Sequence, residues 1–206
     1  MMPKLLAIAG GTASGKTTIV KEFMDFLGER GQLIGVDSYY HSFSELSFEE
    51  RTKKNYDHPS SIDMDLLYSD LLALKGGQTV EVPVYDYVNY TRSSKTHLVE
   101  PRDLIIVEGL FALYDARVRE LFDLSVYVQA DADERLIRRI IRDRKTRGRS
   151  LESIIDQYEK TVKPMHEAFI SPTKKYANII LPGGAQNRKG VELLKSYLIS
   201  AIKEDS

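Results

Sequence analysis

Residues 10 to 18, GGTASGKTT, carry the residue types in this sequence that are best suited to phosphate chemistry, and they directly follow the apolar run LLAIA. They meet the pattern G-x-x-x-x-G-K-[ST] between a predicted buried strand and a predicted helix start. Gly10, Gly11 and Gly15 let the backbone turn so that its N–H groups point inward and form an anion site at the positive end of the helix. The residues predicted to bind the nucleotide are Gly10, Gly11, Thr12, Ala13, Ser14, Gly15, Lys16, Thr17 and Thr18.

Two side chains of this loop have separate tasks. Lys16 is expected to reach the β- and γ-phosphates and to act in catalysis, and the Thr17 hydroxyl is expected to ligate Mg²⁺. A glycine-rich turn that merely precedes a helix gives no reason for Lys-Thr at this spacing. The stretch therefore predicts nucleotide binding.

Two carboxylates follow buried strands, Asp37 in LIGVDSYY and Glu108 in IIVEGLF. Ligands of open parallel sheets lie beyond the carboxyl ends of the strands, so both acids are candidates for a site beside the loop. Asp37 is a candidate catalytic base, or alternatively a helix N-cap. A carboxylate after four apolar residues is costly unless it holds a cation or a hydrogen-bond network, and Mg²⁺ held with Thr17 explains Glu108. We expect the metal near Thr17, Glu108 and Asp37.

The segment 135–149 holds eight basic residues against the single acid Asp143. A helical face of arginine that ends in Arg-Gly-Arg suits a lid, at about residues 135–150, that closes over phosphates. The alternative is a solvated or nucleic-acid-binding helix. The near-neutral chain and the phosphate loop favour the lid.

Composition excludes several classes of protein. The 206 residues are 42% hydrophobic, and 29 Lys and Arg against 30 Asp and Glu give a net charge of −1, which predicts no attraction to nucleic acid or to an anionic membrane. No apolar stretch reaches transmembrane length, and MMPKLLAIAG reads as a first strand rather than a signal peptide, so a cytoplasmic protein is expected. The chain has no cysteine, and its four scattered histidines are expected to be surface or satisfied residues.

Apolar runs alternate with stretches of helical periodicity. The runs are LLAIAG, LIGVD, LIIVEG, LSVYVQ and NIILPG, and helices are expected at about 15–28, 62–75, 115–122, 132–147, 151–170 and 188–203. This order predicts an α/β fold, one domain over 1–206, with a mostly parallel sheet and crossover helices. Pro164 is expected to kink the fifth helix. TVEVPVYDY and KTHLVEP predict an appended β-hairpin at about 79–99.

Two function classes fit a phosphate loop in such a sheet. One is a switch or motor that hydrolyses its nucleotide, and the other is a kinase that passes the γ-phosphate to a small acceptor. The sequence has no Asn-Lys-x-Asp motif for guanine recognition, and it has candidates for the base and the closing cations that a kinase needs. The kinase is favoured.

Several motifs together resemble the uridine–cytidine kinase family from about residue 4 to 187. They are GGTASGKTT, DSYY, NYDHPSSID, PVYDYVNYTR, IIVEGLFAL, DADERLIRRIIRD, RGRS and VKPMHEAFISPTKKYANIILP. Phosphoribulokinases and pantothenate kinases share the loop and the fold, but the hairpin and NYDHP resemble the nucleoside kinases better. The resemblance implies a P-loop kinase with a five-stranded parallel sheet that transfers phosphate from ATP, or sometimes GTP, with Mg²⁺, to the 5′-hydroxyl of a pyrimidine ribonucleoside. It also implies a homo-oligomer, often a tetramer.

The same resemblance assigns roles to individual residues. Asp37 matches the general base, and Asp57 matches the carboxylate that binds the ribose hydroxyls. The residues that match the walls of the base and sugar pocket are Tyr56, Tyr85 and Tyr87. Arg139 matches a residue near the nucleoside and Gln157 a ribose contact, while Arg142, Arg147 and Arg149 match lid residues near the phosphates. GGAQN at 183–187 is a candidate adenine loop.

Tyr90 departs from the family pattern, because many members have histidine there. A neutral imidazole can donate to uracil O4 or accept from the cytosine amine, according to its tautomer. If a nearby acceptor holds the Tyr90 proton, only the hydroxyl lone pairs face the base, and a preference for cytidine over uridine is expected. In the alternative, Tyr90 points to solvent at the hairpin tip and recognises nothing.

Overall fold

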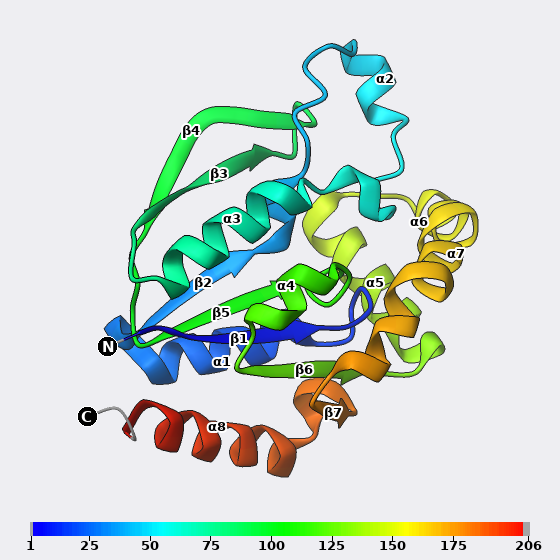
Figure 1. Cartoon of the computed structure of the whole chain (residues 1–206). Helices are drawn as coiled ribbons and strands as arrows, with labels where there is room; N and C mark the ends of the chain where they lie inside the picture. The colour runs from blue at the N-terminus through cyan, green and yellow to red at the C-terminus, as the bar shows by residue number, and fades with distance from the viewer. Residues whose placement is uncertain (1, 204–206) are drawn as a thin grey trace.

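A five-stranded parallel sheet forms the centre of the computed structural model, which describes residues 2–203 (Figure 1). Its strand order is β2-β5-β1-β6-β7, with β1 Lys4–Ala9, β2 Gly31–Gly35, β5 Leu104–Gly109, β6 Leu124–Gln129 and β7 Ile179–Pro182. Each pair of neighbours is parallel. The five apolar runs in the sequence are these strands, so the predicted sheet is confirmed. None of the helices within residues 2–203 is both long and apolar enough to span a bilayer.

Helices cover both faces of the sheet because successive side chains of a strand point to opposite faces. On one face Leu6 and Ile8 of β1 pack in a core with α1 (Lys16–Leu27) and α8 (Arg188–Lys203). On the other face Leu5 and Ala7 pack in a core with α3 (Met64–Lys75) and α4 (Ala116–Leu121). Figure 1 shows α1 and α8 below the sheet and α3 above it. The sheet is therefore the middle of three layers.

The hairpin forms at the predicted place and is fixed to the end of β2. Its strands are β3 (Val80–Asp86) and β4 (Thr91–Val99), an antiparallel pair with an irregular register between Pro83 and Tyr85. Arg92 on β4 donates hydrogen bonds to the carbonyl oxygens of Tyr40 (2.7 Å) and Tyr39 (3.0 Å). These hydrogen bonds attach the hairpin to the segment that follows β2.

The segment 151–170 differs from the single kinked helix predicted by the sequence. It runs as α6 (Leu151–Gln157), a π-helical turn at Tyr158–Val162, α7 (Lys163–Met165), and a second π-helical turn at His166–Ile170. Proline lacks the N–H that an α-helical bond needs, and the wider π turns on both sides of Pro164 accommodate this loss. A change of helix type thus stands where a kink was predicted.

The remaining elements are short, except α5 (Ala132–Arg147), which has the predicted bounds. The helix α2 (Phe48–Thr52) was not predicted, although Ser47 and Glu50 form the capping box that marks its start. The 3₁₀ segments are Gly28–Arg30, Val36–Tyr39, Pro59–Ser61, Ser171–Tyr176 and Gly184–Gln186. Of these, Val36–Tyr39 carries Asp37, the candidate base.

Candidate active site

The loop between β1 and α1 depends on its glycines for two different physical reasons. Gly10 (φ +144°) and Gly15 (φ +101°) adopt backbone conformations that residues with a Cβ rarely adopt, as expected. Gly11 does not have a positive φ, so a left-handed backbone conformation is not the reason for glycine at this position. A Cβ on Gly11 would lie 2.8 Å from Arg135 Nη1 and 2.9 Å from His166 Cε1, so it is close packing that requires glycine at this position.

Lys16 lies buried between this loop and the end of β5. Its ammonium donates to the carbonyl oxygen of Gly11 (3.0 Å) and lies 3.7 Å from Glu108 Oε1. Burial lowers the pKa of Lys16, and the charge of Glu108 opposes that shift. Lys16 therefore links the phosphate loop to Glu108, both of which the sequence predicted to lie in the site. Thr17 and Thr18 are exposed on the first turn of α1.

Asp37 lies inside the 3₁₀ segment Val36–Tyr39, whose N-cap is Gly35, so the N-cap alternative for Asp37 is wrong. Its Oδ1 is buried and has no hydrogen-bond partner. Burial, and next the negative charge of Glu108, raise the pKa of Asp37 to about 6, while Lys16 opposes the shift. A carboxylate with this pKa is suited to accept a proton near neutral pH.

Close packing holds the Asp37 segment against β5. A Cβ on Gly109, the last residue of β5, would lie 2.5 Å from Cβ of Val36. Only glycine allows this approach without a shift of the backbone. The residues that follow Val36 and precede Gly109 are Asp37 and Glu108, so the contact explains why these two carboxyl groups influence each other.

A cluster of tyrosine rings lies beside Asp37 and joins the hairpin to the segment after β2. The ring of Tyr40 lies 5.3 Å from that of Tyr56 and 5.2 Å from that of Tyr85, and Tyr85 lies 5.2 Å from Tyr87. Tyr40 and Tyr85 are buried, whereas Tyr87 is 62% exposed. Burial raises the pKa of the neighbouring Asp57, and Arg139 opposes this shift. The structure thus brings together the tyrosines that were predicted to bind the nucleoside. It adds Tyr40, which the sequence motifs did not single out.

Tyr90 packs at the edge of the same cluster. Its ring is half-buried, 5.8 Å from that of Tyr56 and 6.2 Å from that of Phe48. Within residues 2–203 no acceptor receives a hydrogen bond from its hydroxyl. Residues 2–203 therefore do not supply the acceptor on which the expected cytidine preference depended, and that preference stays a prediction.

The lid is organised around its one acid. Asp143 is fully buried, and Arg142 Nε donates to its Oδ1 at 2.8 Å. The other arginines within 4 Å of the carboxylate are Arg139 (3.6 Å), Arg147 (3.6 Å) and Arg149 (3.9 Å). Although burial alone would favour the neutral form, these arginines, Arg142 foremost, hold the pKa of Asp143 below its ordinary value. Asp143 therefore lies within 4 Å of the arginines that the sequence assigned to the lid.

Arg139 and Gln157 connect the lid to the phosphate loop. Arg139 donates to the Thr12 hydroxyl (3.2 Å) and to Gln157 Oε1 (2.8 Å), and Arg149 also donates to Gln157. Lid and loop are therefore in direct contact. Within residues 2–203 no cluster of three or more His, Asp or Glu side chains is arranged to hold a metal ion.

Comparisons with known proteins agree with this geometry. Residues 5–189 match the model of the phosphoribulokinase / uridine kinase family. The chain belongs to this family. It is 51% identical over 203 residues to a uridine kinase from Halalkalibacterium halodurans, covering 98% of this chain and 96% of the relative. It is 50% identical over 199 residues to a uridine kinase from Staphylococcus carnosus, covering 96% of each.

Solved structures of other kinases share the fold of this family member. A D-glycerate 3-kinase from Cryptococcus neoformans has a TM-score of 0.64 at 16% identity, covering 84% of this chain and 80% of its own. Phosphoribulokinase from Rhodobacter spheroides has a TM-score of 0.63 at 14% identity, covering 88% of this chain and 70% of its own. The predicted family and the P-loop kinase fold are confirmed.

Residues that the sequence analysis passed over lie behind the phosphate loop. His166 was expected to be a surface or satisfied histidine, but its Nδ1 is buried and has no hydrogen-bond partner. Arg135 was counted only among the basic residues of the lid, yet it packs against Gly11. Arg135 lies in the motif DADERLIRRIIRD and His166 in VKPMHEAFISPTKKYANIILP. The periodicity of these motifs predicts helices but does not predict which loop each helix packs against.

Asp143→Asn is predicted to destabilise this protein strongly, because it leaves the lid arginines without the carboxylate that they share. We expect a loss of roughly 3 kcal/mol in the free energy of unfolding, the lower end of the range for breaking a buried pair, since Arg142 and Arg147 are partly exposed. Urea unfolding followed by circular dichroism measures it.

Asp156→Asn is the matched control for this prediction. It removes the same charge from an exposed pair with Lys160 (2.6 Å), where a loss of less than about 1 kcal/mol is expected. Equal losses in the two variants would show that Asp143 does not organise the lid.

Proposed function

We propose that this chain is a pyrimidine ribonucleoside kinase that transfers the γ-phosphate of ATP, or of GTP, to the 5′-hydroxyl of uridine or cytidine and forms UMP or CMP. The observation that carries the proposal is the buried, unpartnered oxygen of Asp37, which lies among Lys16, Glu108 and the tyrosine cluster. A hydrolase that activates water needs no aromatic acceptor pocket next to its base. Relatives about 50% identical over nearly the whole chain bear the name uridine kinase.

The residues at the end of the sheet fit a donor nucleotide with Mg²⁺. Mg²⁺ keeps several waters and takes one or two carboxylates besides the phosphates, so a site without a dense acidic cluster suits it. Thr17, Glu108 and Asp37 would hold the ion, and the unpartnered Oδ1 of Asp37 is an oxygen free to face it. When bound, Mg²⁺ supplies charge neutralisation at the phosphates. The phosphates themselves would lie on residues 10–18, with Lys16 at the β- and γ-groups.

The acceptor is held on the other side of Asp37. Tyr56, Tyr85 and Tyr87 offer flat apolar surfaces for a pyrimidine ring. The carboxylate of Asp57 accepts hydrogen bonds from the ribose hydroxyls, which favours ribose over deoxyribose. Arg139 and Gln157 reach the same sugar. This arrangement leaves the 5′-hydroxyl facing Asp37, which accepts its proton as the phosphate is transferred.

The lid arginines act on the developing charge. Negative charge spreads over the γ-phosphate oxygens during transfer, and fixed cations stabilise it most effectively where water is excluded. Arg142, Arg147 and Arg149 are already gathered on Asp143. The electrostatic influence of Arg147 on both Asp37 and Tyr87 supports its reach into the site.

The setting of the enzyme is part of the proposal. We infer a cytoplasmic enzyme of small molecules that acts as a homo-oligomer, a tetramer by resemblance, without nucleic-acid or membrane partners. The net charge of −1 supports the absence of polyanionic partners. The alternatives are a phosphoribulokinase-like or pantothenate-kinase-like acceptor, or a nucleotide hydrolase.

ADP release with a panel of acceptors tests the function. The panel contains uridine, cytidine, adenosine, deoxycytidine, pantothenate and ribulose 5-phosphate. We expect release that depends on uridine and cytidine, with deoxycytidine at least roughly tenfold poorer because Asp57 loses a ribose hydroxyl. ATP hydrolysis that no acceptor stimulates would favour a switch or motor instead.

Tyr90 gives a second prediction, on the choice of base. Since no acceptor within residues 2–203 holds its proton, the hydroxyl can rotate and serve uracil O4 or the cytosine amine. We therefore expect kcat/KM for uridine and for cytidine within about tenfold of each other, and Tyr90→Phe to lower both alike. A larger preference for cytidine that Tyr90→His removes would instead support the expectation from the sequence, in which an acceptor holds the Tyr90 proton.

A further inference from the structure

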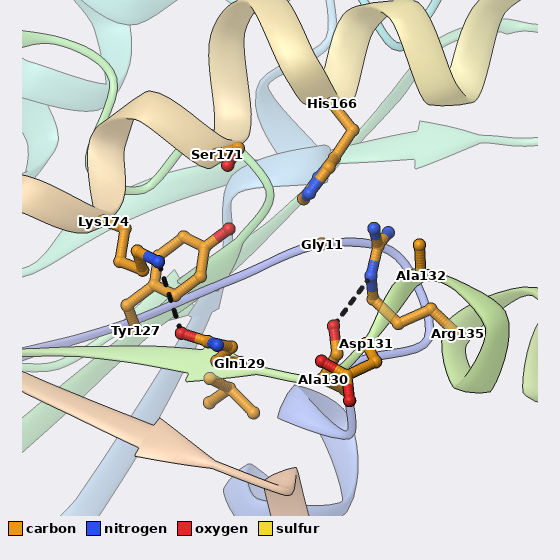
Figure 2. Close-up of a pocket in the computed structure, with 11 residues that line it drawn as sticks. Gly11, Tyr127, Gln129, Ala130, Asp131, Ala132, Arg135, His166, Ser171 and Lys174 are labelled. Carbon is orange, nitrogen blue, oxygen red and sulfur yellow. Dashed lines mark hydrogen bonds between the residues drawn. The ribbon is translucent and has the colours of Figure 1, made fainter.

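A polar cavity of about 170 Å³ lies behind the phosphate loop (Figure 2). It opens between the end of β6, the start of α5 and the segment 166–174 that follows the lid. One water needs about 10–15 Å³ of such space, so the cavity is roughly tenfold larger. The function proposed above uses none of its side chains.

Two residues that line this cavity, Arg135 and His166, each have a buried polar atom without a hydrogen-bond partner. Arg135 is 4% exposed, and its Nε donates to the carbonyl oxygen of Ala130 (3.2 Å), but its Nη1 has no hydrogen-bond partner. The Nδ1 of His166 is likewise buried and unpartnered. Figure 2 shows the guanidinium and the imidazole pointing toward one another beside Gly11. A buried donor without a partner is costly, so these groups indicate a ligand.

The remaining lining is rich in hydrogen-bond donors. Lys174 contributes an ammonium, which is 3.4 Å from Gln129 Oε1, and Ser171 and Tyr127 contribute hydroxyls. Arg135 and Lys174 give two positive charges against the single carboxylate of Asp131, which is exposed. The first turn of the 16-residue helix α5 adds the positive end of its dipole. The cavity therefore favours an anion.

His166 adds a donor or acceptor but no charge at neutral pH. Burial, and next the charge of Arg135, lower the pKa of His166 to about 4. Its neutral ring can donate through one nitrogen and accept through the other. His166 therefore adds no positive charge to the cavity at neutral pH.

We propose that this cavity is a binding site for one oxyanion of the phosphate class, held between Arg135 and Lys174. The donors come from α5 on one side and from residues 171–174 on the other, which suits a tetrahedral anion better than a planar carboxylate. Charge-assisted hydrogen bonds to both cations supply the affinity. The anion lies beside Arg135, whose guanidinium stays packed on Gly11, so bound anion and phosphate loop share this side chain.

Calorimetric titration of inorganic phosphate into the full chain saturated with MgADP tests the site. ADP occupies the phosphate loop, so its binding reports separately on the proposed kinase function. We expect one further phosphate per chain, bound roughly tenfold or more weakly by Lys174→Met, which removes one charged donor. Lys175→Met is the matched control: Lys175 is exposed beside Tyr176 and does not line the cavity, so unchanged phosphate affinity is expected.

Two results would overturn the site. One is no phosphate binding to MgADP-saturated protein, and the other is binding that Lys174→Met leaves unchanged, as it would be at the γ-phosphate position beside Lys16. Circular dichroism and MgADP affinity establish that the Lys174→Met variant is folded. A parallel titration with glycerol 3-phosphate distinguishes two sources of the phosphate group. Binding of glycerol 3-phosphate supports a site for a phosphate group on a larger molecule. Binding of inorganic phosphate alone supports a site for the free ion.

Discussion

The cost of burying charge at the carboxyl edge of the sheet governs the rest of this structure. Lys16 is 7% exposed, and its ammonium contacts both the Gly11 carbonyl and Glu108. Such a buried cation is tolerated only where acceptors surround it. Asp37 is one point at which the fold leaves this demand unmet, because one of its oxygens is buried and unpartnered. Unmet polar groups of this kind concentrate at functional sites, where a ligand completes them.

The lid also has buried charge, and Asp143 balances it. Its arginines lie against Asp143 instead of repelling one another, and the buried carboxylate keeps them at one end of α5. Phosphate offers the same arginines a competing anion with more charge and more acceptor oxygens. In the function that we propose, lid closure would exchange Asp143 for phosphate as the partner of these arginines. Arg139 joins this network to the loop through Thr12 and Gln157.

Sequence patterns predicted the sheet, the hairpin and the position of the phosphate loop between β1 and α1, because each depends on local periodicity or on a fixed spacing. LLAIAG was predicted as a strand before the phosphate loop and contains most of β1, and α5 has the bounds that its periodicity predicted. What the sequence could not provide was the approach of distant segments. The packing of Gly11 against His166 joins residues 155 positions apart, and this histidine, which has an unpartnered nitrogen, begins the π-helical turn His166–Ile170. Tyr90 shows the same limit, because its partners depend on how the hairpin packs.

The pH dependence of nucleoside phosphorylation tests most directly whether Asp37 is the base. Since its pKa is about 6 and the base must be deprotonated, kcat/KM should rise with pH and level off above about 6. Asp37→Asn should lower kcat by about 10² or more, the range for loss of a general base, and should keep MgADP affinity within a few-fold of the wild type. A flat profile between pH 5 and 8, together with near-normal turnover by folded Asp37→Asn protein, would contradict the account.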